Sequence, residues 1–408
     1  MRSDHRGRGG EPGVPLEGGV PRERGERLAE IDWLRVGAIF LVFLIHVAQI
    51  FSPIEDWHIA SPETSWWLGH FTIFLGPWIM PLFMLLAGAA AWFARRRRDD
   101  RDYLRVRVGR LLVPLVAGTL ILIPPQVYLR RRFRGEFEGS FVEFFPRFFD
   151  GVFPEGNFSY GHLWFIAYLL TYMVVALPVF RALEREGGRR LLARMADWME
   201  RPGGVFLPAV LLVAGQLLLR DRFTQTTGAL IGDWATHAWL FTVFILGYAL
   251  LAEGRLMEVL ERQWPLALVP GILLSGGMAL WASAGDVYTR FPGDWTTPGY
   301  FIFWSAFGLL CWCWLAVALG AARRVLRRET AFLRWANPRV YPFYIFHQTV
   351  IVVAAYYLVE LPLGVHLRFF LIGLVSLVGI LATMEIVRRL PGVRNLVGLQ
   401  PRLPPPGR

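Results

Sequence analysis

The sequence predicts an all-α membrane protein, a bundle of about ten transmembrane helices with the N- and C-termini in the cytoplasm. Three observations carry this prediction. Hydrophobic residues make up 54% of the 408 residues, the mean hydropathy of +0.40 exceeds what is usual for soluble domains, and long apolar runs recur from end to end. We therefore expect a multi-pass protein whose main partner is the lipid bilayer.

Ten apolar runs give the order of the predicted crossings, because a hydrocarbon core needs about 20 mostly apolar residues per helix. The runs lie near residues 31–51, 69–94, 110–128, 162–180, 204–220, 235–253, 264–284, 299–322, 340–359 and 366–387. The run at 204–220 is short, and Pro270 interrupts the run at 264–284, so nine or eleven crossings remain alternatives.

The crossings imply one transmembrane domain at 28–390. Residues 1–27 are rich in Gly, Pro and Arg and lack apolar periodicity, so we expect a disordered cytoplasmic tail. Residues 391–408 are expected to be a Pro-rich cytoplasmic tail. Cys311 and Cys313 stand two apart in an apolar run, a spacing that predicts neither a disulfide framework nor a metal site.

The distribution of arginine tests this division, because short cytoplasmic loops are enriched in positive charge. All 43 basic residues are arginine; with the N-terminus inside, 33 fall in inner segments and nine in outer ones. The exception is the cluster RRRFR at 130–134, on the proposed outer side, which fits either a polar cavity or a re-entrant segment. Topology thus accounts for most of the net charge of +11, and no nucleic-acid partner is predicted.

The first run, DWLRVGAIFLVFLIH at 32–46, carries polar residues that a bilayer tolerates poorly. Asp32 and Arg35 open it and His46 ends it. Eleven helical steps bring Arg35 and His46 to within about 20° of each other, about 16 Å apart along the axis. We expect their shared face to line a path across much of the membrane. The structural alternative is that Arg35 snorkels to the inner interface and His46 bonds a backbone carbonyl.

Other polar side chains extend this hypothesis. Arg107 and Arg110, in RVGR, are three apart, so two guanidinium groups on one helix face can clamp a diphosphate; they also fit the positive-inside pattern. His162, in GHLWF, and His347, in YPFYIFHQ, are either functional or structural. Trp164 is either a substrate contact or an interfacial anchor.

These motifs together resemble acyltransferase family three, membrane proteins that O-acylate cell-envelope glycans, lipids and antibiotics. The resemblance begins at LAEIDWLRVGAIFLVFLIH and continues through MPLFMLLAG, RVGRLLVP, GHLWFIAYLL and YPFYIFHQ, over about 28–390. DWLR, HLWF and IPPQVYL at 123–129 are nearer the glucan-succinylating branch. The family often has Ser before Gly in its second-helix motif, whereas this chain has Ala87 before Gly88.

The resemblance implies an acyltransferase of the cell (inner, cytoplasmic) membrane. An acyl group such as acetyl or succinyl passes from a cytoplasmic donor, acyl-CoA as co-substrate, to a hydroxyl of an envelope glycan, lipid or other acceptor. No bound cofactor or metal is implied. Arg107 and Arg110 bind the donor, and Arg35 polarises it with Asp32 orienting the guanidinium.

In the same scheme His46 acts as general base or as covalent acyl carrier. His162, Trp164 and His347 support these groups or contact the acceptor. Two other readings stay open: a polytopic transporter or flippase of an anionic or glycan substrate, and a haem protein with His46 and His347 as ligands.

Overall fold

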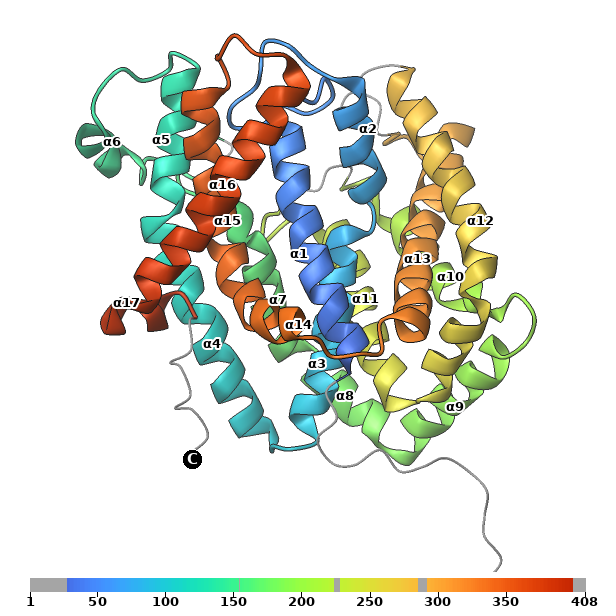
Figure 1. Cartoon of the computed structure of the whole chain (residues 1–408). Helices are drawn as coiled ribbons and strands as arrows, with labels where there is room; N and C mark the ends of the chain where they lie inside the picture. Colours follow the sequence, from blue (N-terminus) through green and yellow to red (C-terminus); the bar gives the residue numbers. More distant parts are fainter. Residues whose placement is uncertain (1–27, 154, 224–227, 285–291, 399–408) are drawn as a thin grey trace, which may run out of the picture.

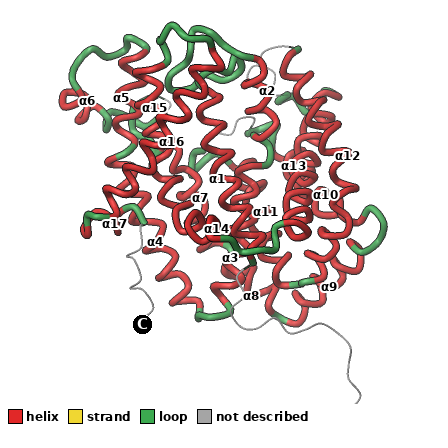
Figure 2. The backbone as a smooth tube through the Cα atoms, viewed as in Figure 1, coloured by secondary structure: helices red, strands yellow, loops and turns green. Residues whose placement is uncertain are grey.

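The computed structural model describes residues 28–153, 155–223, 228–284 and 292–398 (Figure 1). Helices make up about three quarters of this part, and most of the longer loops lie at the two ends of the bundle (Figure 2). The only β interaction within it is an isolated bridge between Val152 and Phe158. The predicted all-α class is confirmed. The tail predicted at 1–27 lies outside the described residues.

Helices coincide with all ten predicted apolar runs. They are α1 (Ala29–Gln49), α2 (Trp66–Leu75), α3 (Ile79–Arg95), α4 (Asp100–Ile121), α5 (Ile123–Phe133), η1 (Gly161–Leu163), α7 (Trp164–Val175), α8 (Leu177–Glu184), η2 (Gly204–Phe206), α10 (Leu207–Leu219), α11 (Trp234–Ala252), α12 (Arg255–Ser283), α13 (Pro298–Val325), α15 (Val340–Leu358) and α16 (Val365–Arg388). Short elements lie between or after them: α6 (Phe141–Arg147), α9 (Glu186–Met199), α14 (Ala331–Ala336), η3 (Asn337–Arg339) and α17 (Pro391–Leu396).

Seven of the described helical segments are long and apolar enough to cross a membrane, and a bent pair, Gly161–Val175 with Leu177–Glu184, raises the number to eight. The segment at Gly204–Leu219 is apolar but shorter. α15 is not among the seven, and its centre carries the polar sequence HQT at 347–349. The structure therefore supports a multi-pass membrane protein.

Local sequence explains where the helices begin, bend and continue. The Asp99 carboxylate accepts a hydrogen bond from the Asp102 amide and caps α4, which starts ten residues before the predicted apolar run. A bend of 47° between α7 and α8 falls just before Pro178. Pro270, expected as a break, lies inside the continuous helix α12.

α1 lies in the middle of the view in Figure 1 and organises the bundle. It contacts α2, α3, α13, α15 and α16. α3 and α11 pack closely because glycines stand where their backbones meet: a Cβ on Gly88 would lie 1.9 Å from the Phe244 carbonyl oxygen, and one on Gly247 the same distance from that of Leu85. This close packing fixes α3 against α11, and α3 also contacts α1.

Candidate active site

Three imidazole rings meet near the C-terminal end of α1. The His46 ring centroid lies 5.1 Å from that of His347 on α15, and the His347 centroid lies 5.2 Å from that of His162 on η1. His347 and His162 are buried, whereas His46 is partly exposed. These residues, the histidine cluster, come from three distant parts of the chain, and His46 is its most exposed member.

The hydrogen bonds of the rings assign their protons. His347 Nδ1 lies 2.6 Å from the Tyr344 carbonyl oxygen and His162 Nε2 lies 3.0 Å from that of Ile345. A carbonyl only accepts, so these ring nitrogens are the donors. The opposite nitrogen of His347, Nε2, is therefore an acceptor, and it is buried with no hydrogen-bond partner in the described residues. A neutral base is thus held next to His46.

Amide side chains form a polar layer beside the histidine cluster. Gln126 on α5 donates to Thr349 Oγ1 at 2.7 Å and lies 3.4 Å from His162 Nδ1. Gln348 donates to Gln126 Oε1 at 3.1 Å and lies 2.9 Å from His58 Nε2. Burial, and then the charge of Arg130, lowers the pKa of His58 to about 3. His58 is therefore neutral at physiological pH.

The connection between α1 and α2 covers this end of the site. The Trp57 indole stacks on His46, with centroids 5.9 Å apart and planes inclined by 22°. Arg134 holds the connection by bonds to Asp56 Oδ1 at 2.5 Å and to the Trp57 carbonyl at 3.1 Å. Arg368 on α16 pairs with Glu63. The RRRFR segment, the exception in the arginine distribution, thus contributes to a brace over the histidine cluster.

Arginine side chains converge near the other end of α1. Arg35 donates to the Leu86 carbonyl at 3.4 Å and Arg107 to the Ala90 carbonyl at 3.2 Å, so both reach one face of α3 on consecutive turns. Asp32 Oδ1 lies 3.5 Å from Arg35. Arg107 interacts electrostatically with both Arg35 and Arg110. Arg35, Arg107 and Arg110, the arginine cluster, form a local concentration of positive charge suited to an anionic ligand.

One side of α15 joins the two clusters. Near its start, the Tyr341 hydroxyl donates to the Arg110 carbonyl at 3.2 Å. One turn on, the Tyr344 hydroxyl bonds the His162 carbonyl, and His347 follows after three more residues. Because positions three apart lie on one helix face, α15 extends from the arginine cluster to the histidine cluster, beside the face of α1 that carries Arg35 and His46.

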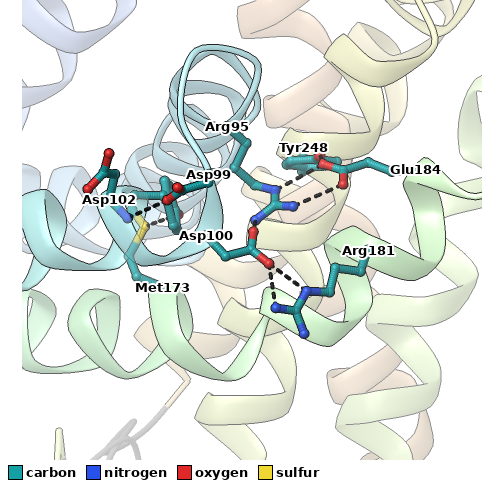
Figure 3. A network of polar contacts seen from close by, with 9 residues as sticks. Arg95, Asp99, Asp100, Asp102, Met173, Arg181, Glu184 and Tyr248 are labelled. Carbon is teal, nitrogen blue, oxygen red and sulfur yellow. Dashed lines mark hydrogen bonds and ion pairs between the residues drawn. The ribbon is translucent and has the colours of Figure 1, made fainter.

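A separate ion-pair network braces the ends of α3, α4 and α8 (Figure 3). Arg95 contacts both oxygens of Glu184 at 2.9 Å and pairs with Asp100, whose other oxygen bonds Arg181 at 2.5 Å. Tyr248 donates to Glu184 at 2.5 Å. A cleft of about 530 Å³ adjoins this network. The network engages all three nitrogens of the Arg95 guanidinium, so Arg95 acts as a brace.

The structure brings together seven of the eight residues that the sequence singled out, in two groups. His46, His162 and His347 form one group; Arg35, Asp32, Arg107 and Arg110 form the other. Trp164 lies elsewhere: its ring packs edge-on against Tyr168, 5.2 Å away, and against the backbone at Gly228. Within the described residues it has no ring contact with the histidines.

Sequence reasoning missed Gln49, Trp57, His58, Gln126 and Gln348, which contact the histidine cluster directly or through one another. Only Gln49 carried a usable signal, since it stands three residues after His46 on the same helix. The described residues contain no group of three or more His, Cys, Asp or Glu side chains that could hold a metal ion.

Comparison with known proteins gives a family match over most of the chain. A family model described as an acyltransferase domain matches residues 28–385. Glucans biosynthesis protein C of Escherichia coli O6:K15:H31 is 24% identical over 155 residues, 38% of this chain and 39% of the relative. Its namesake in Salmonella typhi is 23% identical over 155 residues, 37% and 38% of the two chains. The chain thus matches about two fifths of these relatives' length. No solved structure matches it significantly.

Proposed function

Because the chain belongs to the acyltransferase-domain family, we propose that it is an integral membrane enzyme that transfers an acyl group to a hydroxyl. The donor is a cytoplasmic acyl-CoA carrying an acetyl, succinyl or similar group. The acceptor is an envelope glycan, a lipid or a related alcohol on the outer side. The names of the similar proteins, which refer to glucan biosynthesis, support a glycan acceptor and agree with the predicted branch.

One observation carries the proposal: a single face of α1 presents Arg35 to the arginine cluster and His46 to the histidine cluster. Eleven residues of α helix separate the two groups by about 16 Å along the axis. A donor whose phosphates bind the arginines must therefore extend its thioester arm along α1 and α15 to reach His46. A long, flexible, anionic donor such as acyl-CoA fits this separation of charge and base.

Arg107 and Arg110 bind the donor phosphates in this scheme, and Arg35 binds or polarises the donor deeper in the bundle. Asp32, 3.5 Å from Arg35, orients that guanidinium. The two arginines that reach α3 leave donor groups free for a ligand, because each makes a single bond to a carbonyl of that helix. The arginine cluster thus retains hydrogen-bonding capacity for phosphate.

His46 acts as general base at the acceptor end. The acceptor oxygen attacks the thioester carbonyl carbon as His46 takes the hydroxyl proton. The bond from carbon to sulfur then breaks, and the proton passes to the departing thiolate, which leaves as CoA. His347 and His162 stand behind His46 and stabilise the imidazolium that forms between the two proton transfers.

We further propose that the protein lies in the cell's inner membrane with ten crossings and both termini in the cytoplasm. Eight segments, the bent pair included, are long and apolar enough to cross the membrane, and α10 and α15 bring the number to ten. The arginine distribution sets which ends of the helices face the cytoplasm. The arginine cluster faces the cytoplasm and the histidine cluster faces outward. This orientation places donor and acceptor on the sides where each is available.

The test is an assay of product in reconstituted vesicles. Purified protein in phospholipid vesicles receives acetyl-CoA or succinyl-CoA labelled in the acyl group, with envelope glucan oligosaccharides as acceptor. The proposal requires a labelled O-acyl ester, identified by mass spectrometry, and free CoA in equal amount. Passage of oligosaccharide across the vesicle membrane with no ester would instead support the transporter or flippase reading.

A further inference from the structure

We propose that Gln49 is a positioning residue that holds the proton of His46 on Nδ1 and so directs the unprotonated Nε2 toward the reacting atoms. This inference rests on the proposed function, because it concerns how His46 serves as base. It adds a residue that lies on α1 itself, at the last position of the helix. Gln49 donates no proton to the substrate and acts only through His46.

The hydrogen bond between Gln49 and His46 is short and specific. The His46 Nδ1 atom lies 2.6 Å from the side-chain carbonyl oxygen of Gln49, Oε1. An amide oxygen can only accept, so the ring nitrogen that faces it carries the proton. A neutral imidazole has one protonated nitrogen, and Nε2 of His46 is therefore the nitrogen that can accept a proton.

The Glu55 side chain is a neighbour of the Gln49 amide. The Glu55 carboxyl lies beside Gln49 and Thr72, and Thr72 already donates its hydroxyl proton to the Gly69 carbonyl. With Oε1 of Gln49 turned toward His46, the NH₂ group of the same amide is the part of Gln49 that can donate to this carboxyl. The other carboxyl oxygen, Oε2, is buried with no hydrogen-bond partner in the described residues.

Charged and titratable groups face His46 from three directions. His347 approaches from α15 and His162 from η1, while Glu55 and His58 belong to the connection after α1. Burial raises the pKa of the Glu55 carboxyl above its usual value. The neutral form of that carboxyl still has a carbonyl oxygen that can accept a hydrogen bond from the Gln49 amide.

Two substitutions at position 49 test the inference. Gln49→Leu keeps the approximate size but removes the acceptor. Gln49→Glu keeps an acceptor and adds a negative charge. Thr242→Val on α11 is the control, because within the described residues the Thr242 hydroxyl bonds the Ala238 carbonyl of its own helix and neither cluster. All variants are measured in the same vesicles after size-exclusion chromatography confirms a monodisperse protein.

We expect Gln49→Leu to lower kcat by about 100-fold, since loss of the group that orients a catalytic histidine can cost up to about 10⁴-fold. The KM for acyl-CoA should change by less than about threefold, because the donor binds at the arginine cluster. Gln49→Glu should keep activity within about tenfold of wild type at high pH, with the acid limb of its pH profile moved upward, because a carboxylate stabilises the imidazolium.

The results also separate this inference from the proposed function. Wild-type kcat in Gln49→Leu, or an unshifted pH profile in Gln49→Glu, overturns the role of Gln49 even if His46→Ala is inactive. Full activity in His46→Ala overturns the proposed base itself. An equal loss of kcat in Gln49→Leu and Gln49→Glu also contradicts the inference. Gln49→Glu keeps an acceptor and Gln49→Leu does not, so equal losses would mean that position 49 matters for packing and not for its hydrogen bond to His46.

Discussion

The rings of His46 and His347 lie with their centroids 5.1 Å apart and their planes inclined by 34°. The two residues differ in access: His347 is fully buried, and His46 is partly exposed. Each ring has Nδ1 next to an oxygen acceptor, from Tyr344 and Gln49 respectively. The two imidazoles thus lie side by side with different access to ligands, which supports the proposed role of His46 as the base.

His46→Ala should abolish acyl transfer while the protein remains folded and inserted. Loss of a general base costs about 10²- to 10⁴-fold in rate, so we expect no product above background in the vesicle assay. His70→Ala is the matched control, because His70 bonds Ser283 on the periphery at 2.8 Å and does not contact the cluster. Activity in His46→Ala equal to that of the control would contradict the assignment.

His347→Asn should lower kcat by about tenfold and leave the KM for acyl-CoA unchanged. The asparagine amide can replace the Nδ1 donor to the Tyr344 carbonyl, but it removes the basic Nε2 that faces the interior. A general base accelerates a reaction by at least about 10²-fold. A residue that acts behind the base should contribute less to the rate than the base itself. A rise in KM with unchanged kcat would instead place His347 in donor binding.

Arg107→Ala should raise the KM for acyl-CoA by roughly tenfold or more, the effect of losing one charge-assisted hydrogen bond. The guanidinium contacts only the Ala90 carbonyl and the face of Tyr103, so its removal does not break an ion pair within the described residues. Arg105→Ala, an exposed arginine two residues earlier on α4, is the control. Equal KM values for the two variants would show that Arg107 contributes only to the positive charge of the cytoplasmic side and not to donor binding.

How much of this site the sequence could predict depends on how far apart the contacting residues lie along the chain. Arg35 and His46 share one helix, so their common face follows from the helical repeat. Their partners do not: His347 and Leu86 reach them only after the chain folds, through contacts between α1 and other helices. Periodicity predicts which residues share a face of α1, and tertiary packing decides which groups from other helices lie against that face.

The fold shows the same difference between features set by local sequence and features set by tertiary contacts. Apolar length and the arginine distribution were enough to locate all ten helical regions, because both are properties of local sequence. They could not predict that α4 extends back to Asp99, where a side-chain cap and polar residues continue the helix beyond the apolar run. The motif GHLWF suggested Trp164 as a substrate contact or an interfacial anchor, and in the structure its ring packs against Tyr168 and not against the histidine cluster.

Gly88→Ala should destabilise the fold although it lies outside both clusters. A Cβ at position 88 would stand 1.9 Å from the Phe244 carbonyl oxygen and 3.1 Å from the Tyr248 amide nitrogen, so α3 and α11 would have to separate. Overpacking of this kind costs about 1–3 kcal/mol. The displacement of α3 would also carry the Leu86 and Ala90 carbonyls away from Arg35 and Arg107, so activity should fall with stability.

Gly276→Ala on α12 gives the contrast, because a Cβ there meets no atom within 4 Å. Alanine in a helix interior is favoured over glycine by about 0.5–1 kcal/mol, so this variant should match or exceed the wild-type melting temperature in detergent. The measurement is the midpoint of thermal unfolding for the two variants side by side. Equal midpoints would mean that the α3–α11 contact is looser than the glycines indicate, and that the carbonyls of α3 do not set the position of the arginine cluster.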